Sequence, residues 1–325
     1  MLVVKLLSIR YFRIAIIFTV AVLVYIVLSF WEFNTVKKEL KTILPVGMCS
    51  VTRQSPTKTI HRMRILCIIL TSGESQDKMN AVNGTWSKRC DKKLFVYSSA
   101  IESPLSPYTI HLPVPESYEH LTGKVRKTLE FVYQQCNDSF DWILKCDDDT
   151  FIVMDNLRHM LAGLDPQKPA YLGFRLNPAF GKYDEYVPRG YMSGGAGYVI
   201  NSRALHDVVN TGFKRGACRE DGGDEDVEMG KCLDAAGVPM HSTLDSEGKE
   251  TFHLQSLHYH LTLKNETVLQ QPPKDALNSG PWGEKCCSNY PVSFHYVKPV
   301  EMYMFEYLLY NASVHMSDNR DSGHL

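Results

Sequence analysis

The sequence predicts an α/β domain in which helices flank a mostly parallel sheet. Short, continuous apolar runs alternate with segments of helical periodicity between residues 65 and 174. Each apolar run ends at a polar turn, and one of them ends at three adjacent aspartates. In sheets of this kind the ligand lies at the carboxyl ends of the strands, so the aspartates mark a candidate site.

The composition is that of an ordinary globular protein of 325 residues, enough for one large core or two small ones. There are 35 basic and 36 acidic residues, and no long basic run follows the first residues. The chain therefore lacks the charge pattern of a nucleic-acid-binding protein, and we expect no nucleic acid partner.

The N-terminal part of the chain predicts a membrane anchor. Residues 14–31 carry no charge and are just long enough to cross a bilayer. Basic residues before this run favour a cytoplasmic N-terminus, although lysines also follow it. A cleaved signal peptide is the alternative, but no clear small-x-small cleavage site follows the run. We expect a cytoplasmic tail at 1–13, a transmembrane signal anchor at 14–31, a luminal stem at 32–62, a folded domain at 63–310 and a polar tail at 311–325.

Nine cysteines fit an oxidising compartment. Their odd number leaves at least one of them unpaired or joined to another chain. A disulfide between two copies through Cys49 is one such arrangement and would make a homodimer. Four N-x-Ser/Thr acceptors agree with the secretory pathway, at Asn83, Asn137, Asn265 and Asn311.

The elements follow from these patterns in chain order. Continuous apolar runs predict buried strands, and apolar residues three or four apart predict amphipathic helices. We expect a strand at 65–70, a helix through Met79, Val82 and Trp86, a strand at 94–97, a helix through Leu121, Val125, Leu129 and Val132, a strand ending at Asp147, a helix through Leu157, Met160, Leu161 and Leu164, and a strand at 170–174.

The apolar run from Phe140 ends at Asp147, Asp148 and Asp149. Three adjacent carboxylates repel one another, so holding them together costs free energy unless a cation or hydrogen-bond donors offset the charge. Magnesium, manganese and calcium prefer such oxygen ligands and often bind a substrate phosphate as well. The stretch predicts a metal–diphosphate site, with an exposed acidic turn as the alternative.

Three later segments carry further candidates. Gly194 and Gly195 lie in a glycine cluster that indicates either close backbone approach to a ligand or simple turn packing. Ser202 is expected to cap the next helix. The acidic segment 221–233 begins another helix. One of its carboxylates could act as a base, and the helix dipole would stabilise the others as ordinary first-turn residues. His295 is either a hydrogen-bonded core residue or a ligand of a manganese-like metal.

Taken together, these segments resemble glycosyltransferase family 31, most closely its core 1 β1,3-galactosyltransferase (T-synthase) group. The matching motifs occur in the order of the family between about Arg64 and Tyr310. They are Gly84-Thr85-Trp86, Leu144–Phe151, Gly190–Tyr198, Glu225-Asp226-Val227, Gly248–His253, Cys286-Cys287-Ser288 and Val292–Val297.

The resemblance implies a GT-A (Rossmann-like) catalytic domain at 63–310 in a single-pass type II protein of the Golgi or endoplasmic reticulum membrane, with that domain in the lumen. The implied activity is inverting transfer of galactose from UDP-galactose to the 3-hydroxyl of N-acetylgalactosamine on Ser or Thr of glycoproteins, the core 1 step of O-glycan synthesis.

The resemblance also implies roles for individual residues. Asp149 would bind Mn²⁺ directly, Asp147 and Asp148 would contact the nucleotide or metal-bound water, and His295 would complete the metal site. Asp147, Asp149 and His295 are thus the expected metal set.

On the acceptor side, the resemblance assigns Asp226 as the base and places Gly194 and Gly195 along the sugar pocket. Such a displacement needs one base, and a Lewis acid on the departing UDP.

Two other functions remain open. The chain could be a related β1,3-glycosyltransferase with a different acceptor or donor sugar, because the stretch 264–282 lacks the expected aromatic run. It could also be a non-catalytic chaperone of such an enzyme, although a chaperone should have lost the acidic motif and His295.

Overall fold

The computed structural model describes residues 22, 24, 25, 63–72, 76–98, 108–136, 139–177, 185–262 and 286–313. The chain divides into two compact units, Met1–Met48 and Cys49–Leu325. Within the described ranges, no helix has the length and apolar character needed to cross a membrane. Several expectations fall outside these residues: most of the span 14–31, the stem 32–62 with Cys49, the sequons at Asn137 and Asn265, the stretch 264–282 and most of the C-terminal tail.

A six-stranded sheet forms the centre of the larger unit, with the strand order β3-β2-β1-β4-β9-β6. Parallel pairs join β1 to β2, β1 to β4 and β2 to β3, whereas β9 is antiparallel to both β4 and β6. The expected α/β class with a mostly parallel sheet is therefore confirmed. The strands are β1 (Ile65–Leu70), β2 (Lys92–Ser98), β3 (Thr109–Leu112), β4 (Trp142–Asp147), β6 (Tyr171–Gly173) and β9 (Tyr198–Asn201).

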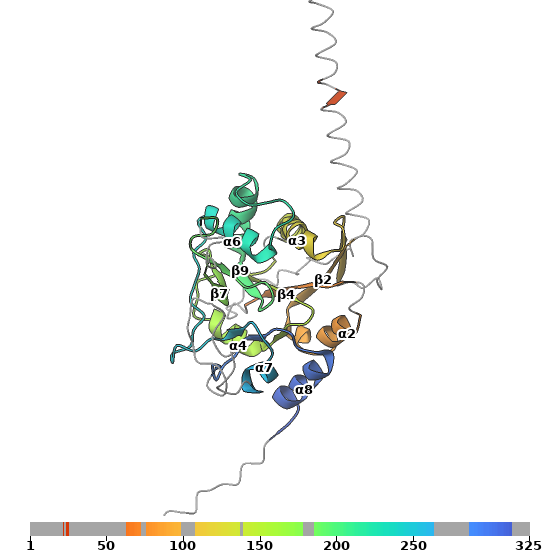
Figure 1. Cartoon of the computed structure of the whole chain (residues 1–325), viewed down its shortest axis with the longest axis vertical. Coiled ribbons are helices and arrows are strands. Elements are labelled where there is room, and N and C mark those ends of the chain that lie inside the picture. The colour runs from red at the N-terminus through yellow and green to blue at the C-terminus, as the bar shows by residue number, and fades with distance from the viewer. Residues whose placement is uncertain are drawn as a thin grey trace, which may run out of the picture. The chain divides into compact units, whose positions relative to one another are not determined.

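Helices cover both faces of this sheet, with α3 and α6 on one side and α2, α4, α7 and α8 on the other (Figure 1). The C-terminal helix α8 packs against α2. The α-helices are α2 (Gln76–Gly84), α3 (Leu121–Cys136), α4 (Met154–Leu161), α5 (Ser202–Asp207), α6 (Glu225–Ala235), α7 (Leu257–Thr262) and α8 (Pro299–Tyr310). Shorter turns of helix are η1 (Trp86–Arg89), η2 (Tyr118–His120) and the π-helical η3 (Val208–Phe213).

The described part of the chain also contains two small sheets. One has the order β10-β11-β5, and the other pairs β7 with β8. Their strands have two residues each: β5 (Phe151–Ile152), β7 (Arg175–Leu176), β8 (Tyr191–Met192), β10 (Phe252–His253) and β11 (Ser293–Phe294). Because β5 follows the aspartate cluster and β11 precedes His295, their pairing brings two distant parts of the chain together.

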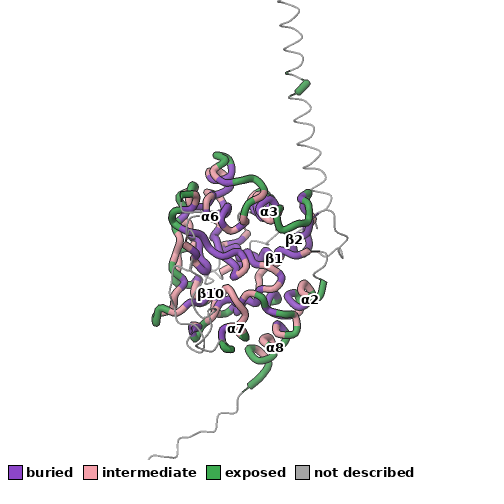
Figure 2. The backbone as a smooth tube through the Cα atoms, viewed as in Figure 1, coloured by how far each residue is buried: buried purple, intermediate pink, exposed green. Residues whose placement is uncertain are grey.

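The central strands owe their position to their apolar side chains. Every residue of β1 is buried, and β4 is buried up to its last residue, Asp147 (Figure 2). Burying apolar surface is the main favourable contribution to folding, which explains why these runs lie in the middle of the sheet. Leu70 pairs with Asp147, so β1 and β4 end side by side.

Three sequence expectations differ from the structure in detail. The expected helix through Trp86 ends at Gly84, and Trp86 instead begins η1. The expected helix through Leu164 ends at Leu161. Ser202 is not the cap of α5, because the side chain of Asn201 accepts the hydrogen bond from the Ala204 N–H at 2.9 Å.

Disulfides agree with the expected oxidising compartment. Three pairs are formed among the described residues: Cys67–Cys90, Cys218–Cys232 and Cys286–Cys287. Cys136 is also disulfide-bonded. Cys146 carries a free, buried thiol, which fits the odd number of cysteines.

Candidate active site

A pocket of ≈ 380 Å³ lies at the carboxyl ends of β1 and β4. Its volume is within the usual range for small-molecule sites. It contains every site residue expected from the sequence. The lining consists of Leu70, Thr71, Ser72, Lys78, Glu116, Tyr118, Leu121, Lys124, Lys145, Asp147, Asp148, Asp149, Gly194, Gly195, Glu225, Asp226, His295 and Tyr296.

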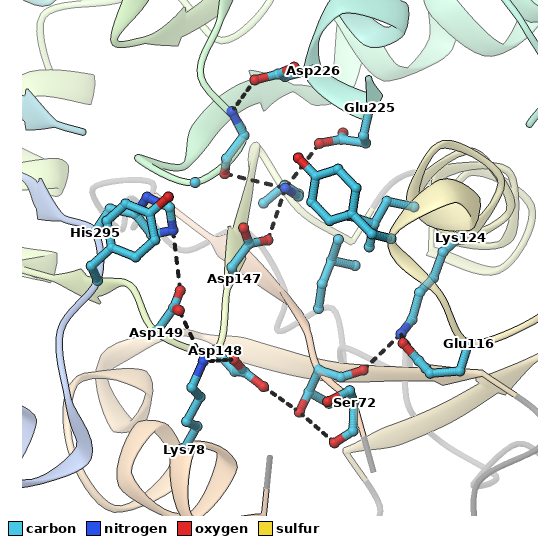
Figure 3. A pocket seen from close by; sticks show the side chains of 18 residues that line it. Ser72, Lys78, Glu116, Lys124, Asp147, Asp148, Asp149, Glu225, Asp226 and His295 are labelled. Atoms are coloured by element: carbon cyan, nitrogen blue, oxygen red, sulfur yellow. Dashed lines mark hydrogen bonds and ion pairs between the residues drawn. The ribbon is translucent and has the colours of Figure 1, made fainter. Parts of the chain in front are cut away.

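Asp147, Asp149 and His295 form a cluster of metal-ligand types whose ligand atoms all lie within 4.8 Å of one another. His295 reaches this cluster because β11 pairs with β5, and the Val297 N–H donates to the Asp149 carbonyl at 2.8 Å. His295 Nε2 lies 3.3 Å from Asp149 Oδ1 (Figure 3). Two carboxylates and one imidazole are a donor set that suits Mn²⁺.

The charge state of Asp149 follows from its neighbours. Burial alone would raise the pKa of this carboxyl, but the contacts with His295 and Lys78 outweigh burial and lower it to about 2. Lys78 Nζ lies 3.0 Å from Asp149 Oδ2. Asp149 is therefore a permanent anion at neutral pH, as a metal ligand must be.

Asp148 has a different environment from the aspartates on either side. It is buried, and Thr71 Oγ1, at the end of β1, donates to its Oδ2 at 2.8 Å. Burial and the charges of the neighbouring aspartates raise the pKa of Asp148 to about 6, against the opposing effects of Thr71 and Lys78. Its side chain is held by Thr71, and the cluster of metal-ligand types found among the described residues of this pocket consists of Asp147, Asp149 and His295.

Asp226 lies in the first turn of α6, across the pocket from Asp148 and Lys78, with Asp147 between them (Figure 3). Its Oδ2 accepts from the Gly194 N–H at 3.1 Å, and its Oδ1 accepts from the Val227 N–H at 2.9 Å. Burial, followed by the charge of Glu225, raises the pKa of Asp226 to about 6. A fixed carboxylate with a raised pKa is a suitable general base.

Lys145 joins the two halves of the pocket. It is 3% exposed, and its Nζ donates to Asp147 Oδ1 at 3.1 Å, Glu225 Oε2 at 3.1 Å and the Gly194 carbonyl at 3.3 Å. Burial alone would lower the pKa of Lys145, but the charges of Asp147 and Glu225 raise it well above its ordinary value. Tyr198 Oη donates to the other Glu225 oxygen at 2.8 Å, so Glu225 is fixed on both sides.

The two glycines allow close approach within the site. A side chain at Gly195 would overlap the His295 ring, and one at Gly194 would meet the Glu225 carboxylate at 2.8 Å. Both positions line the pocket, and their missing side chains make room for His295 and Glu225. These contacts are packing within the protein, and the approach of a ligand to the two glycines stays a prediction.

His295 is followed by a residue in an unusual backbone conformation. Tyr296 has φ = 54°, and its ring stacks on His295 with centroids 3.8 Å apart. A side chain in the left-handed region costs free energy and often marks a functional site. The turn that positions His295 is therefore strained.

Three residues of the site were not identified from the sequence. Lys78 is a single lysine whose acidic partners lie far away in the chain. Lys145 has one acidic partner two residues away, Asp147, and one that is distant, Glu225, which resembles any first-turn acidic residue. One signal was available for Lys145, because a lysine in the middle of a buried strand needs a charged partner.

The family comparison covers most of the chain. The Fringe-like family matches residues 64–299. A glycoprotein-N-acetylgalactosamine 3-beta-galactosyltransferase 1 of Xenopus laevis is 34% identical over 273 residues, which span 80% of this chain and 72% of that protein. A beta-1,3-glucosyltransferase of Mus musculus is 25% identical over 70% of this chain, and the matched part spans 40% of its own length.

Solved structures give weaker matches. The galactosyltransferase LgtC, in complex with donor and acceptor sugar analogues, shares 12% identity and a TM-score of 0.38 over 72% of this chain and 87% of LgtC. The mannosyltransferase PcManGT of Pyrobaculum calidifontis, in complex with GDP-Man and Mn²⁺, shares 13% identity and a TM-score of 0.36 over 58% of each chain.

The family match at 64–299 includes every residue that lines the pocket, and the Xenopus relative matches 80% of the chain. The chain therefore belongs to the Fringe-like family of glycosyltransferases, family 31, and is a homologue of the core 1 β1,3-galactosyltransferase.

Proposed function

We propose that the chain is an inverting GT-A glycosyltransferase that moves galactose from UDP-galactose to the 3-hydroxyl of N-acetylgalactosamine linked to Ser or Thr. One observation carries the proposal. A single pocket is lined by Asp147, Asp149 and His295, which suit a divalent metal, and by Asp226, a carboxylate of raised pKa. The 34% identity to the Xenopus galactosyltransferase supports the choice of sugars.

Asp147, Asp149 and His295 would hold Mn²⁺ in this enzyme. The metal would supply a Lewis acid that stabilises the negative charge on the departing UDP. The chain orients these ligands from outside the cluster: Lys145 holds Asp147 at 3.1 Å, and the pairing of β11 with β5 places His295. Residues that fix metal ligands in this way commonly strengthen metal binding.

Asp226 would take the proton from the acceptor hydroxyl as that oxygen attacks the sugar. Its raised pKa, about 6, leaves it largely ionised at neutral pH while making it a better proton acceptor than an ordinary aspartate. A direct displacement of this kind inverts the anomeric centre and needs this one base. A retaining route through a covalent intermediate would need a second, differently placed carboxylate.

We further propose the topology expected from the sequence, with an anchor at 14–31, a stem at 32–62 and the catalytic domain, 63–310, in the lumen of the Golgi or endoplasmic reticulum. Disulfides such as Cys67–Cys90 and Cys218–Cys232 support an oxidising compartment for this domain. Glycoproteins that carry N-acetylgalactosamine would meet the enzyme there.

The test is a transfer assay on the full chain in detergent, with Mn²⁺ and a peptide carrying N-acetylgalactosamine on threonine. We expect galactose to be transferred from UDP-galactose with a β1,3 linkage, and the reaction to stop when the metal is chelated. UDP-glucose and UDP-N-acetylglucosamine serve as alternative donors. A folded protein that binds UDP but transfers no galactose to the peptide, whether or not it transfers another of these sugars, would contradict the proposal.

A further inference from the structure

Among the residues that the structure describes, three lysines line the pocket, and two of them are fully engaged by the protein. Lys124 is 2% exposed, and its Nζ donates to the Thr71 carbonyl at 2.7 Å and to Glu116 Oε2 at 3.0 Å. Lys145 is equally buried and donates to two carboxylates and one carbonyl. Moving either ammonium would leave buried acceptors without a donor, which is costly, so neither is free to follow a ligand.

Lys78, the third lysine, is held differently. Its side chain is 40% exposed and comes from α2 at the rim of the pocket (Figure 3). Its Nζ lies 3.0 Å from Asp149 Oδ2 and 3.6 Å from Asp148 Oδ1. Both partners belong to the acidic cluster, so the contacts of Lys78 depend on the charge of that cluster.

A lysine ammonium and a divalent cation compete for the same carboxylates. Asp149 has His295 at one oxygen and Lys78 at the other, so a metal ion held by Asp149 and His295 would lie close to the ammonium. Like charges at that range repel, and the carboxylate charge that attracts Lys78 would already be neutralised. The long, partly exposed side chain of Lys78 can then take another anion.

We propose that Lys78 exchanges partners during donor binding. As Mn²⁺ binds the acidic cluster, the Lys78 ammonium breaks its ion pairs with Asp149 and Asp148 and binds the diphosphate of the sugar nucleotide instead. The inference rests on the proposed function, because it requires a nucleoside diphosphate sugar and a metal in this pocket. A lysine is well suited to both positions, as a compact charge on a flexible stem that binds phosphate without fixed geometry.

The two roles of Lys78 predict opposite effects of removing its charge. Lys78 opposes the binding of Mn²⁺ alone, since it must give up its ion pair, and it favours the binding of UDP with Mn²⁺, since it gains a charge-assisted contact. Free metal would therefore bind weakly, and metal and nucleotide would bind best together.

The test measures both affinities by titration calorimetry on the full chain after metal removal by chelation. For Lys78→Met we expect Mn²⁺ alone to bind about 2- to 5-fold more tightly, the value of a partly exposed ion pair. UDP with saturating Mn²⁺ should bind about tenfold more weakly, as expected for the loss of one hydrogen bond to a charged group. Lys78→Arg should stay close to wild type in both. Lys88→Met, at an exposed lysine of η1 that does not line the pocket, should change neither.

If the wild type binds both Mn²⁺ and UDP, two results would overturn this inference and leave the proposed function standing. In the first, Lys78→Met leaves the affinity for UDP unchanged; in the second, Lys78→Met weakens the binding of Mn²⁺. The second result would mean that Lys78 orients Asp149 for the metal instead of competing with it. A wild type that binds neither Mn²⁺ nor UDP would overturn the proposed function, and this inference with it.

Discussion

Replacing Glu225 by glutamine should make Asp226 a weaker base and move the pH dependence of kcat/KM. Burial is the larger cause of the raised pKa of Asp226, and the charge of Glu225 is the next. Other charged and titratable groups in this region include Lys145, which opposes the shift, Asp147 and Asp224, and the tyrosines at 118, 171 and 198. Glu225→Gln removes one negative charge and keeps the size of the side chain.

The size of the effect can be worked from the raised pKa. With a pKa of about 6, Asp226 is about one-tenth ionised at pH 5, so the kcat/KM of the wild type at pH 5 should be about a tenth of its plateau. The acid limb, the fall in activity on the acidic side of the pH profile, should move down by about one pH unit when an adjacent like charge is removed. The variant should then keep about half of its own plateau at pH 5.

The assay is kcat/KM for galactose transfer from pH 4.5 to 8, because this ratio reports the pKa values of the free enzyme. Tyr198→Phe is the matched control, because it removes the hydroxyl that donates to Glu225 Oε1 and leaves the charge of Glu225 in place. We expect its limb to stay at the wild-type pH. Asp148 also has a pKa raised to about 6, but its hydrogen bond comes from Thr71, so the Glu225 change should leave it unaffected.

The reasoning would be refuted by a Glu225→Gln variant that is folded and active but whose acid limb coincides with that of the wild type. The limb would then belong to another group, and the charge of Glu225 would not set the basicity of Asp226.

Two further predictions concern the metal site and the stability of the fold. Gly195→Ala should displace His295, because the added carbon overlaps its ring. Binding of Mn²⁺, measured by electron spin resonance, should weaken at least about tenfold. Gly163→Ala is the control, since its added carbon meets only the Met160 carbonyl at 3.7 Å, and equal Mn²⁺ affinities of the two variants would contradict the packing argument. Burial, followed by the charge of His260, lowers the pKa of His253 to about 3. Below about pH 6.5 this histidine is protonated in the unfolded chain but stays neutral in the folded chain, so the folded state loses stability as the pH falls below 6.5. This single group should cost about 2 kcal/mol at pH 5 by urea unfolding, and a His253→Leu variant with the same loss between pH 7 and pH 5 as the wild type would argue against it.

Much of the fold could be predicted from local patterns. β1 is a continuous apolar run and β4 is apolar apart from Lys145 and Asp147, and such runs are buried in parallel sheets, so their position could be predicted from the sequence. The two-residue strands β5 and β11 have no detectable periodicity, because they form only when segments far apart in the chain meet. The cap of α5 was misassigned because Asn201 and Ser202 are both good capping residues.

Some residues of the candidate site could likewise be predicted from local sequence, and others could not. The aspartates 147–149 could be identified because three adjacent carboxylates need compensation wherever they fold. Asp226 and His295 could be given roles only through the family resemblance, since each has a common structural alternative. Lys145 depends on Glu225, which lies 80 residues away in the sequence, and no local pattern relates the two.

The same limit applies to Lys78. It lies in a helix of ordinary polar composition, and only the packing of α2 beside the end of β4 brings its ammonium to Asp149, 71 residues away in the sequence. Long-range ion pairs of this kind are set by the tertiary fold, so they appear only when the fold is known.

The division of the pocket into a donor half and an acceptor half is tested most directly by comparing Asp149→Ala with Asp226→Asn. Calorimetry with UDP and Mn²⁺, beside the transfer assay, gives binding and turnover for each variant. We predict that Asp149→Ala loses metal-dependent UDP binding, whereas Asp226→Asn binds UDP and Mn²⁺ like the wild type and loses at least about 100-fold in turnover. Near-normal turnover by Asp226→Asn, or metal-dependent UDP binding by Asp149→Ala, would contradict the account.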